Sequence, residues 1–223
     1  MSLLDHCYCI NLDSRPDRWE ESVKEFDRVG LNVKRWRAVE ASTSRQEEID
    51  LFYRKKNQRN FAAEVACFKS HLSIIEYARD RKFKEVTIFE DDVVFLYDDF
   101  VKRLKKLDFH LPFNWTCVSY GVLAINMIPY GKNKLFTILN SFVGAHSYSI
   151  NSKVYNYILN KAIKNNLPYD KFLSNIFGPT KKGFFINPPA CIQRQSYSDI
   201  SDDYKDQSVI NGITMRQKFY KKL

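Results

Sequence analysis

The chain has 223 residues, of which 44% are hydrophobic and 15% aromatic, so it can form one large domain or two small ones with a proper core. Its 35 Lys and Arg residues exceed its 26 Asp and Glu residues, and the formal net charge of +9 favours anionic partners such as nucleotides, nucleic acids or membrane surfaces. The basic residues are scattered rather than gathered in runs interleaved with aromatic residues, so specific nucleic-acid binding is not expected.

The first half of the chain alternates between strand and helix patterns. Residues 7–10 form an apolar strand, and a helix follows in which Ser14 is expected to provide the cap and Gly30 the stop. Residues 33–39 alternate as a second strand would, whereas residues 46–59 are strongly charged and predict a solvated helix or a mobile loop. The opening unit is therefore strand, helix, strand.

The rest of the chain continues this alternation less regularly. Further helices are predicted over residues 62–81, 98–107, 152–164, with Ser152 as the cap, and 168–177. Further strands are predicted over residues 84–89, 115–120, 135–139, 146–150, 183–187 and 190–194. This order predicts an α/β fold with a mostly parallel central sheet flanked by helices, in a single domain of residues 1–200. Residues 201–223 are expected to form a C-terminal tail that is packed on the surface or partly disordered.

The cysteines and the N-terminus bear on the compartment. The five cysteines form an odd set without a CxxC pair, and four of them lie in apolar segments, which predicts reduced, buried thiols. The sequence as given begins without the basic and apolar regions of a signal peptide, and it has no apolar stretch of about 20 residues. These observations predict a soluble, cytoplasmic protein without a transmembrane segment.

Three consecutive carboxylates follow the predicted strand 84–89: Glu90, Asp91 and Asp92. Adjacent carboxylates raise one another's pKa unless a cation is close, and hard divalent cations such as Mg²⁺ and Mn²⁺ favour oxygen ligands. Acidic residues also follow strands as solvated turn formers. From these residues alone, a metal site and a solvated turn both stay open.

Arg15 and Arg18 follow the first strand at the start of a helix, a position suited to phosphate or nucleobase binding. The alternative is that they balance the nearby carboxylates of Asp13 and Asp17. The segment contains neither a GxGxxG sequence nor a Walker loop, so it does not support a dinucleotide-binding dehydrogenase or a P-loop NTPase.

His71 lies one helical turn after Cys67 in the predicted helix 62–81. No second pair of metal-ligating residues follows this lone Cys and His, so the pattern favours a structural histidine over a zinc ligand.

Several short segments, taken together and in order, resemble glycosyltransferase family 25, which includes lipooligosaccharide and procollagen galactosyltransferases. The resemblance extends over residues 7 to 200, and the segments that carry it are 11–18, 64–71, 86–93, 144–150, 168–173, 192–193 and 198–200. It implies a GT-A-like fold, a nucleotide-sugar donor and inversion at the anomeric carbon.

The resemblance also implies site residues. Asp91 and Asp92 become ligands of Mn²⁺ or Mg²⁺, and Glu90 or Asp91 becomes a nucleotide contact. The other residues implied to lie around a UDP-sugar are Ile10, Asn11, Leu12, Arg15, Arg18, Ser70, His71, Gln193, Ser198 and Asp199. An inverting transfer needs a base for the acceptor hydroxyl, and Asp170 is the candidate, with helix capping as an equal alternative.

Three functions follow from these patterns. The first is metal-dependent transfer of galactose or glucose from a UDP-sugar to a glycan or a protein hydroxyl. The second is a catalytically inactive glycosyltransferase-like module that binds a nucleotide or glycan, or acts in adhesion. The third, a metal-dependent nuclease or other nucleic-acid binder, rests only on the net charge and the acidic cluster.

Overall fold

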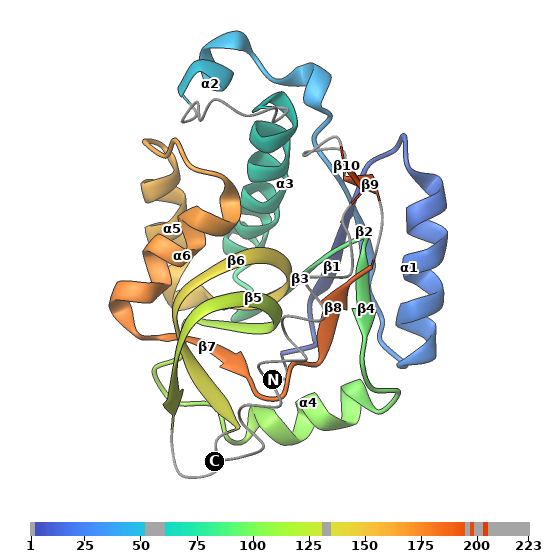
Figure 1. Ribbon diagram of the computed structural model, residues 1–223, viewed down its shortest axis with the longest axis vertical. Coiled ribbons are helices and arrows are strands. Elements are labelled where there is room, and N and C mark those ends of the chain that lie inside the picture. The colour runs from blue at the N-terminus through green and yellow to red at the C-terminus, as the bar shows by residue number, and fades with distance from the viewer. Residues whose placement is uncertain (1–2, 52–60, 131–134, 195–196, 199–202, 205–223) are drawn as a thin grey trace.

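A six-stranded sheet forms the centre of the computed structural model, which describes residues 3–51, 61–130, 135–194, 197–198 and 203–204 (Figure 1). The strand order is β2-β1-β3-β6-β5-β7, and β6 runs antiparallel to both of its neighbours while the other five strands share one direction. The strands are β1 (Cys7–Asn11), β2 (Lys34–Arg37), β3 (Glu85–Glu90), β5 (Cys117–Tyr130), β6 (Phe136–Asn151) and β7 (Gly183–Ile186). The predicted α/β fold with a mostly parallel sheet is therefore confirmed.

Helices cover both faces of this sheet, with α1 on one side and α3, α5 and α6 on the other (Figure 1). The helices are α1 (Pro16–Arg28), α2 (Gln46–Leu51), α3 (Phe61–Asp80), α4 (Phe100–Asp108), α5 (Tyr155–Ala162) and α6 (Tyr169–Thr180), with short 3-10 helices at Ala41–Thr43 and Ser152–Val154. Two small sheets pair β4 (Val93–Phe95) with β8 (Cys191–Gln193) and β9 (Tyr197–Ser198) with β10 (Asp203–Tyr204).

Alternation along the strands divides the core into two layers. In β1, Ile10 packs in the layer that includes α3, α5 and α6, whereas Cys9 packs in the layer that includes α1 and α4. In β3, Ile88 and Phe89 divide in the same way, and both are fully buried. Successive residues of a strand point to opposite faces, so the side chains at the strand ends are aimed at different helices.

Two predicted helix caps are wrong. The residue before α1 is Arg15 rather than Ser14, because Pro16, whose fixed φ suits the first helical turn, begins the helix. Ser152 does not cap the next predicted helix either. It lies inside a short 3-10 helix whose cap is Asn151, and the Asn151 side chain accepts a backbone N–H from two residues further on.

The predicted strands 135–139 and 146–150 are parts of one strand, β6, and β5 continues well beyond the predicted residue 120. The long β5–β6 pair contains several register shifts, and Gly144 adopts a φ of +85° that only glycine adopts easily. These irregularities let the pair bend, so that the start of β6 also pairs with β7. Two strands were predicted instead of one because Asn140, Ser141 and Gly144, which lie between them, are residue types typical of turns.

The cysteine prediction is confirmed: all five are free thiols, and only Cys67 is partly exposed. None of the helices in the described part of the chain is both long and apolar enough to span a membrane. Of the predicted segment 46–59, residues 46–51 form α2 and residues 52–60 lie outside the described residues. Most of the predicted tail, residues 205–223, also lies outside them.

Candidate functional site

The acidic triplet lies at the carboxyl end of β3, beside the carboxyl end of β1. The two strands are parallel neighbours, and Ile10 pairs with Glu90. Asn11, the last residue of β1, donates from its side-chain amide to Asp91 Oδ2 at 2.7 Å and to the backbone oxygen of Arg15 at 2.9 Å. Asn11 and Asp91, which the family resemblance implies around the donor, are therefore joined by a direct hydrogen bond between their side chains.

The three carboxylates face different helices. Glu90, the last residue of β3, shares the parity of Ile88 and faces His71 of α3. Asp91 and Asp92 lie in the turn after β3, beyond the strand alternation, and both contact Arg18 of α1, while the Ser22 hydroxyl of α1 donates to the Asp91 backbone oxygen. The side chain of Glu90 is 26% exposed, and that of Asp91 is 9% exposed. The triplet thus divides into one carboxylate toward α3 and a buried pair toward α1.

Arg18 supplies the positive charge for the buried pair. Its guanidinium lies 3.2 Å from Asp91 Oδ1 and 3.3 Å from Asp92 Oδ2, and its side chain is only 13% exposed. Burial raises the pKa of Asp91 above its ordinary value, while the Arg18 charge and the Asn11 hydrogen bond act in the opposite direction. Arg18 therefore contacts the acidic pair directly, and its predicted contact with the nucleotide stays a prediction.

The guanidinium of Arg15 forms an exposed ion pair with Asp17 at 3.0 Å, one of the contacts that the alternative interpretation expects, and its role at the nucleotide stays a prediction. Asp13 pairs with Arg35 and Arg37 of β2. Ile10 and Leu12 flank Asn11, and Ile10 is a core residue.

Arg35 also contributes to the site, a role that was not predicted from the sequence. Its guanidinium donates to Asn11 Oδ1 at 2.8 Å and so fixes which end of the Asn11 amide faces Asp91. Cys9 and Arg35 are register partners in the parallel β1–β2 pair. The feature of the sequence that could have indicated this contact is that Arg35 is a basic residue within the predicted strand 33–39.

Strand β8 brings Gln193 to the triplet from a distant part of the chain. The Gln193 amide donates to Asp92 Oδ2 at 3.3 Å, and the backbone N–H of Arg194 donates to the Asp92 backbone oxygen at 2.6 Å. Ser198 lies in β9, and Asp199 lies outside the described residues. Part of the predicted C-terminal motif thus contacts the acidic pair.

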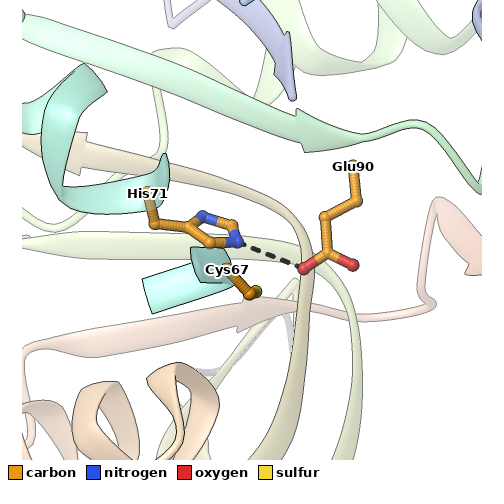
Figure 2. Close-up of side chains that lie close together, drawn as sticks. All are labelled: Cys67, His71 and Glu90. Atoms are coloured by element: carbon orange, nitrogen blue, oxygen red, sulfur yellow. Dashed lines mark hydrogen bonds and ion pairs between the residues drawn. The ribbon is translucent and has the colours of Figure 1, made fainter. Parts of the chain in front are cut away.

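Ser70 and His71 are neighbours on α3 with different contacts. The Ser70 hydroxyl donates to the backbone oxygen of Ala66 at 2.7 Å and accepts the backbone N–H of Val39 at 2.8 Å. It therefore joins α3 to the segment that follows β2. His71 instead faces the triplet, with Nε2 at 3.3 Å from Glu90 Oε1 (Figure 2).

Two buried tyrosines hold the His71 ring. Nδ1 of His71 is hydrogen-bonded to the Tyr148 hydroxyl at 2.8 Å, and the Tyr148 and Tyr169 hydroxyls are 2.7 Å apart. The Tyr169 ring stacks on the His71 ring with centroids 4.1 Å apart. Burial raises the pKa of both tyrosines well above their ordinary value, so both are neutral at pH 7. Both lie in or beside segments that carry the family resemblance, but nothing local in the sequence indicated this contact.

Asp170 lies in the first turn of α6, directly after Tyr169. Its Oδ2 accepts the backbone N–H of Gly144 at 3.0 Å, and its Oδ1 accepts the backbone N–H of Lys171 at 2.7 Å. The side chain therefore joins α6 to β6 and is only partly buried. Through Tyr169 and His71, this helix start is connected to Glu90; a role as catalytic base stays a prediction.

The donor atoms around the buried pair suit a hard divalent cation. Asp91 and Asp92 offer buried carboxylate oxygens, and oxygen donors are those that Mn²⁺ and Mg²⁺ prefer, while Gln193 turns the nitrogen of its side-chain amide toward Asp92 Oδ2. The Arg18 guanidinium balances the carboxylates in the same place. The residues present therefore fit such an ion.

A mostly parallel sheet with charged side chains gathered beyond the carboxyl ends of its strands defines an α/β domain, a class of fold in which ligands generally bind at that edge. Residues 4–173 match the family described as glycosyltransferase family 25 (LPS biosynthesis protein). The chain belongs to glycosyltransferase family 25, a family of glycosyl-transferring enzymes, which confirms the resemblance found in its motifs.

Curated relatives agree with this membership. A glycosyltransferase 25 family member of Drosophila melanogaster is 33% identical over 101 residues, covering 41% of this chain and 16% of the relative. One of Anopheles gambiae is 30% identical over 151 residues, covering 59% and 22%. The procollagen lysyl hydroxylase and glycosyltransferase of Acanthamoeba polyphaga mimivirus is 26% identical over 206 residues, covering 82% and 22%. The chain thus spans 16% to 22% of the length of these relatives.

Among solved structures, the apo form of mouse xyloside xylosyltransferase 1 superposes with a TM-score of 0.45 and 7% sequence identity, covering 81% of this chain and 83% of that one.

Proposed function

We propose that this domain transfers a hexose, galactose or glucose, from a UDP-sugar to a hydroxyl group of a glycan or a protein side chain, with inversion at the anomeric carbon. The observation that carries the proposal is the buried cluster in which Asn11, Arg18 and Gln193 converge on Asp91 and Asp92. Family membership supplies the reaction class. The mimivirus relative, a procollagen lysyl hydroxylase and glycosyltransferase, supports a hydroxylated lysine as one acceptor.

The cluster supplies groups for both parts of the donor. The Arg18 guanidinium can contact a diphosphate through charged hydrogen bonds while its positive charge still offsets the negative charge of the Asp91 and Asp92 carboxylates. Asn11 and Glu90, at the ends of adjacent strands, would border the nucleotide, together with Ile10, Leu12, Arg15, Ser70, His71, Ser198 and Asp199. Asp91 and Asp92, with Gln193, would hold Mn²⁺ or Mg²⁺, and the bound cation would offset the charge of the leaving diphosphate.

Asp170 is the proposed base. Each of its oxygens accepts one backbone N–H, and a carboxylate oxygen has a second acceptor site, so the group can also accept the acceptor hydroxyl. In the transfer step, the acceptor oxygen bonds to the anomeric carbon and the bond from that carbon to the diphosphate breaks. The hydroxyl proton passes to the Asp170 carboxylate, and UDP leaves. The two backbone hydrogen bonds would keep the carboxylate fixed for this step.

Release of UDP tests the proposal. The protein is incubated with Mn²⁺, UDP-galactose or UDP-glucose, and either a glycan or a peptide that contains hydroxylysine. We expect acceptor-dependent UDP release, and we expect Asp170→Asn to lower kcat about 10²- to 10⁴-fold, the usual contribution of a general base. Asp17→Asn is the matched control, because Asp17 occupies the first turn of α1 and its side chain is 63% exposed.

The runner-up is a module that binds a nucleotide without transferring a sugar. Arg18 already balances the acidic pair, and both Asp170 oxygens already serve the fold, so these residues also have structural uses. Thermal stabilisation by UDP and Mn²⁺, with no UDP released from any donor and acceptor pair, would favour this function over transfer. Acceptor-dependent UDP release that is lost in Asp170→Asn would exclude it.

A further inference from the structure

Cys67, His71 and Glu90 form a second group of possible metal ligands on the α3 side of the triplet. One ligand atom from each, a sulfur, a ring nitrogen and a carboxylate oxygen, lie within 4.8 Å of one another (Figure 2). Cys67 and His71 are one turn apart on α3, and residues at this spacing share a helix face. The third ligand comes from the end of β3, so the lone Cys and His of the sequence become a set of three only in the fold.

The His71 ring is already oriented for coordination. A metal-binding histidine usually uses its other ring nitrogen in a hydrogen bond that fixes its tautomer and orientation. Here Nδ1 is hydrogen-bonded to the neutral Tyr148 hydroxyl at 2.8 Å, and the Tyr148 hydroxyl is hydrogen-bonded to the Tyr169 hydroxyl. If Nδ1 donates this bond, the lone pair of Nε2 points toward Glu90. Stacking on Tyr169 holds the ring in that direction.

The spacing suits a tetrahedral ion with one small adjustment. For ligand bonds of about 2.0–2.3 Å, tetrahedral ligands lie about 3.3–3.8 Å apart. His71 Nε2 and Glu90 Oε1 are 3.3 Å apart. The largest separation in the group is at most 4.8 Å, so Cys67 Sγ has to approach by about 1 Å, which a change in its unbranched χ1 torsion can provide.

We propose that Cys67, His71 and Glu90 bind a zinc-like ion, with the fourth position left for water or an exogenous ligand. The mixture of thiolate, imidazole and carboxylate selects Zn²⁺ and related ions over Mg²⁺ and Mn²⁺, which prefer oxygen alone. On binding, the Cys67 thiol releases its proton to solvent as the sulfur–metal bond forms. The partial exposure of Cys67 and Glu90 gives the ion a route to the ligand atoms.

Occupation of this site has a consequence that rests on the proposed function. If Glu90 contacts the nucleotide, an ion bound to Glu90 removes that contact. Zn²⁺ then inhibits sugar transfer even when Mn²⁺ is saturating. The binding itself does not depend on any sugar donor, so it is tested without one.

Co²⁺ is the probe, because a cobalt–thiolate bond gives a charge-transfer absorption band that oxygen ligands do not give. The full chain, metal-free and reduced, is titrated with Co²⁺ alone. We expect the band to saturate at one equivalent, to be absent in Cys67→Ser and to weaken in Tyr148→Phe, which loses about 10-fold in affinity. Asp92→Asn, a change in the other proposed metal site, retains the band, as does Cys7→Ser, a control for thiol number.

Alkylation of the unmodified protein tests metal binding by Cys67 without a substitution that could itself disturb the fold. Zn²⁺ is expected to protect Cys67 from iodoacetamide, measured by mass spectrometry. Failure of Co²⁺ to give the band, persistence of the band in Cys67→Ser, or alkylation of Cys67 at the same rate with and without Zn²⁺ would each overturn the proposal. None of these results depends on whether the protein transfers a sugar.

Discussion

Replacement of Arg18 by Gln tests how the buried acidic pair is stabilised. The guanidinium lies 3.2 and 3.3 Å from Asp91 and Asp92, and all three side chains are at most 13% exposed. Removal of one partner from a buried ion pair leaves an uncompensated charge and typically costs about 3–5 kcal/mol. For a chain of this size, about 3 kcal/mol corresponds to a fall in Tm of roughly 6–12 °C.

The stability lost in Arg18→Gln should depend on pH. Burial already raises the pKa of Asp91, so the native state binds more protons than the unfolded chain between the ordinary and the raised pKa. This contribution to stability is present at low pH and is lost as the pH rises through that window. Without Arg18 the pKa of Asp91 rises further. The difference in the free energy of unfolding between Arg18→Gln and the unmodified protein is therefore largest at neutral pH and becomes smaller toward a pH of about 4.

Thermal unfolding followed by circular dichroism measures both effects. Arg15→Gln is the control, because its ion pair with Asp17 is exposed and screened by solvent, so its loss should change Tm far less than the loss of Arg18. Millimolar Mn²⁺ should restore part of the lost Tm in Arg18→Gln, since a cation at the carboxylates replaces the missing charge. Equal Tm values for the two variants, or no response of Arg18→Gln to Mn²⁺, would refute this account of the site.

Two further predictions concern other parts of the fold. A Cβ on Gly178 would lie 2.2 Å from the backbone oxygen of Asn140, so Gly178→Ala should force α6 away from β6 and lower stability by about 1–3 kcal/mol in urea unfolding; an unchanged midpoint would contradict this. The Lys69 ammonium, with a backbone N–H of Arg45, lowers the pKa of Glu48 to about 2, so this pair stabilises the fold above about pH 4.5 and less as the pH falls. Because Glu48 lies near the surface, Glu48→Gln should cost up to about 1 kcal/mol at pH 7 and less at pH 3, and a cost that does not vary with pH would argue against this charge interaction.

Much of the fold could be predicted from local pattern. The apolar segments around Ile10 and Ile88 are continuous enough to indicate buried parallel strands, and the stop at Gly30 corresponds to a φ of +69° there. The convergence of Asn11 and Asp91 could also be expected, because the carboxyl ends of neighbouring parallel strands meet at one edge.

The remaining features depend on contacts that sequence spacing does not encode. The bend in the β5–β6 pair, and with it the continuity of β6, depends on pairing with a distant strand. Contact between His71 and Glu90 requires that the His71 face of α3 pack on the side of the sheet to which Glu90 points. Tyr148 of β6 adds a hydrogen bond to His71 from a third element. Likewise, Arg35 reaches Asn11 only because β2 lies beside β1 in this register.

The central claim is that Asp91, Asp92 and Gln193 form a cation-dependent site for the donor nucleotide. Isothermal titration calorimetry of UDP binding, with Mn²⁺ and with EDTA, tests it most directly. We predict that the unmodified protein binds UDP at least about 10-fold more tightly with Mn²⁺, a difference of about 1.4 kcal/mol, and that Asp92→Asn removes this difference. The same UDP affinity with Mn²⁺ and with EDTA, or an undiminished Mn²⁺ effect in Asp92→Asn, would contradict the claim.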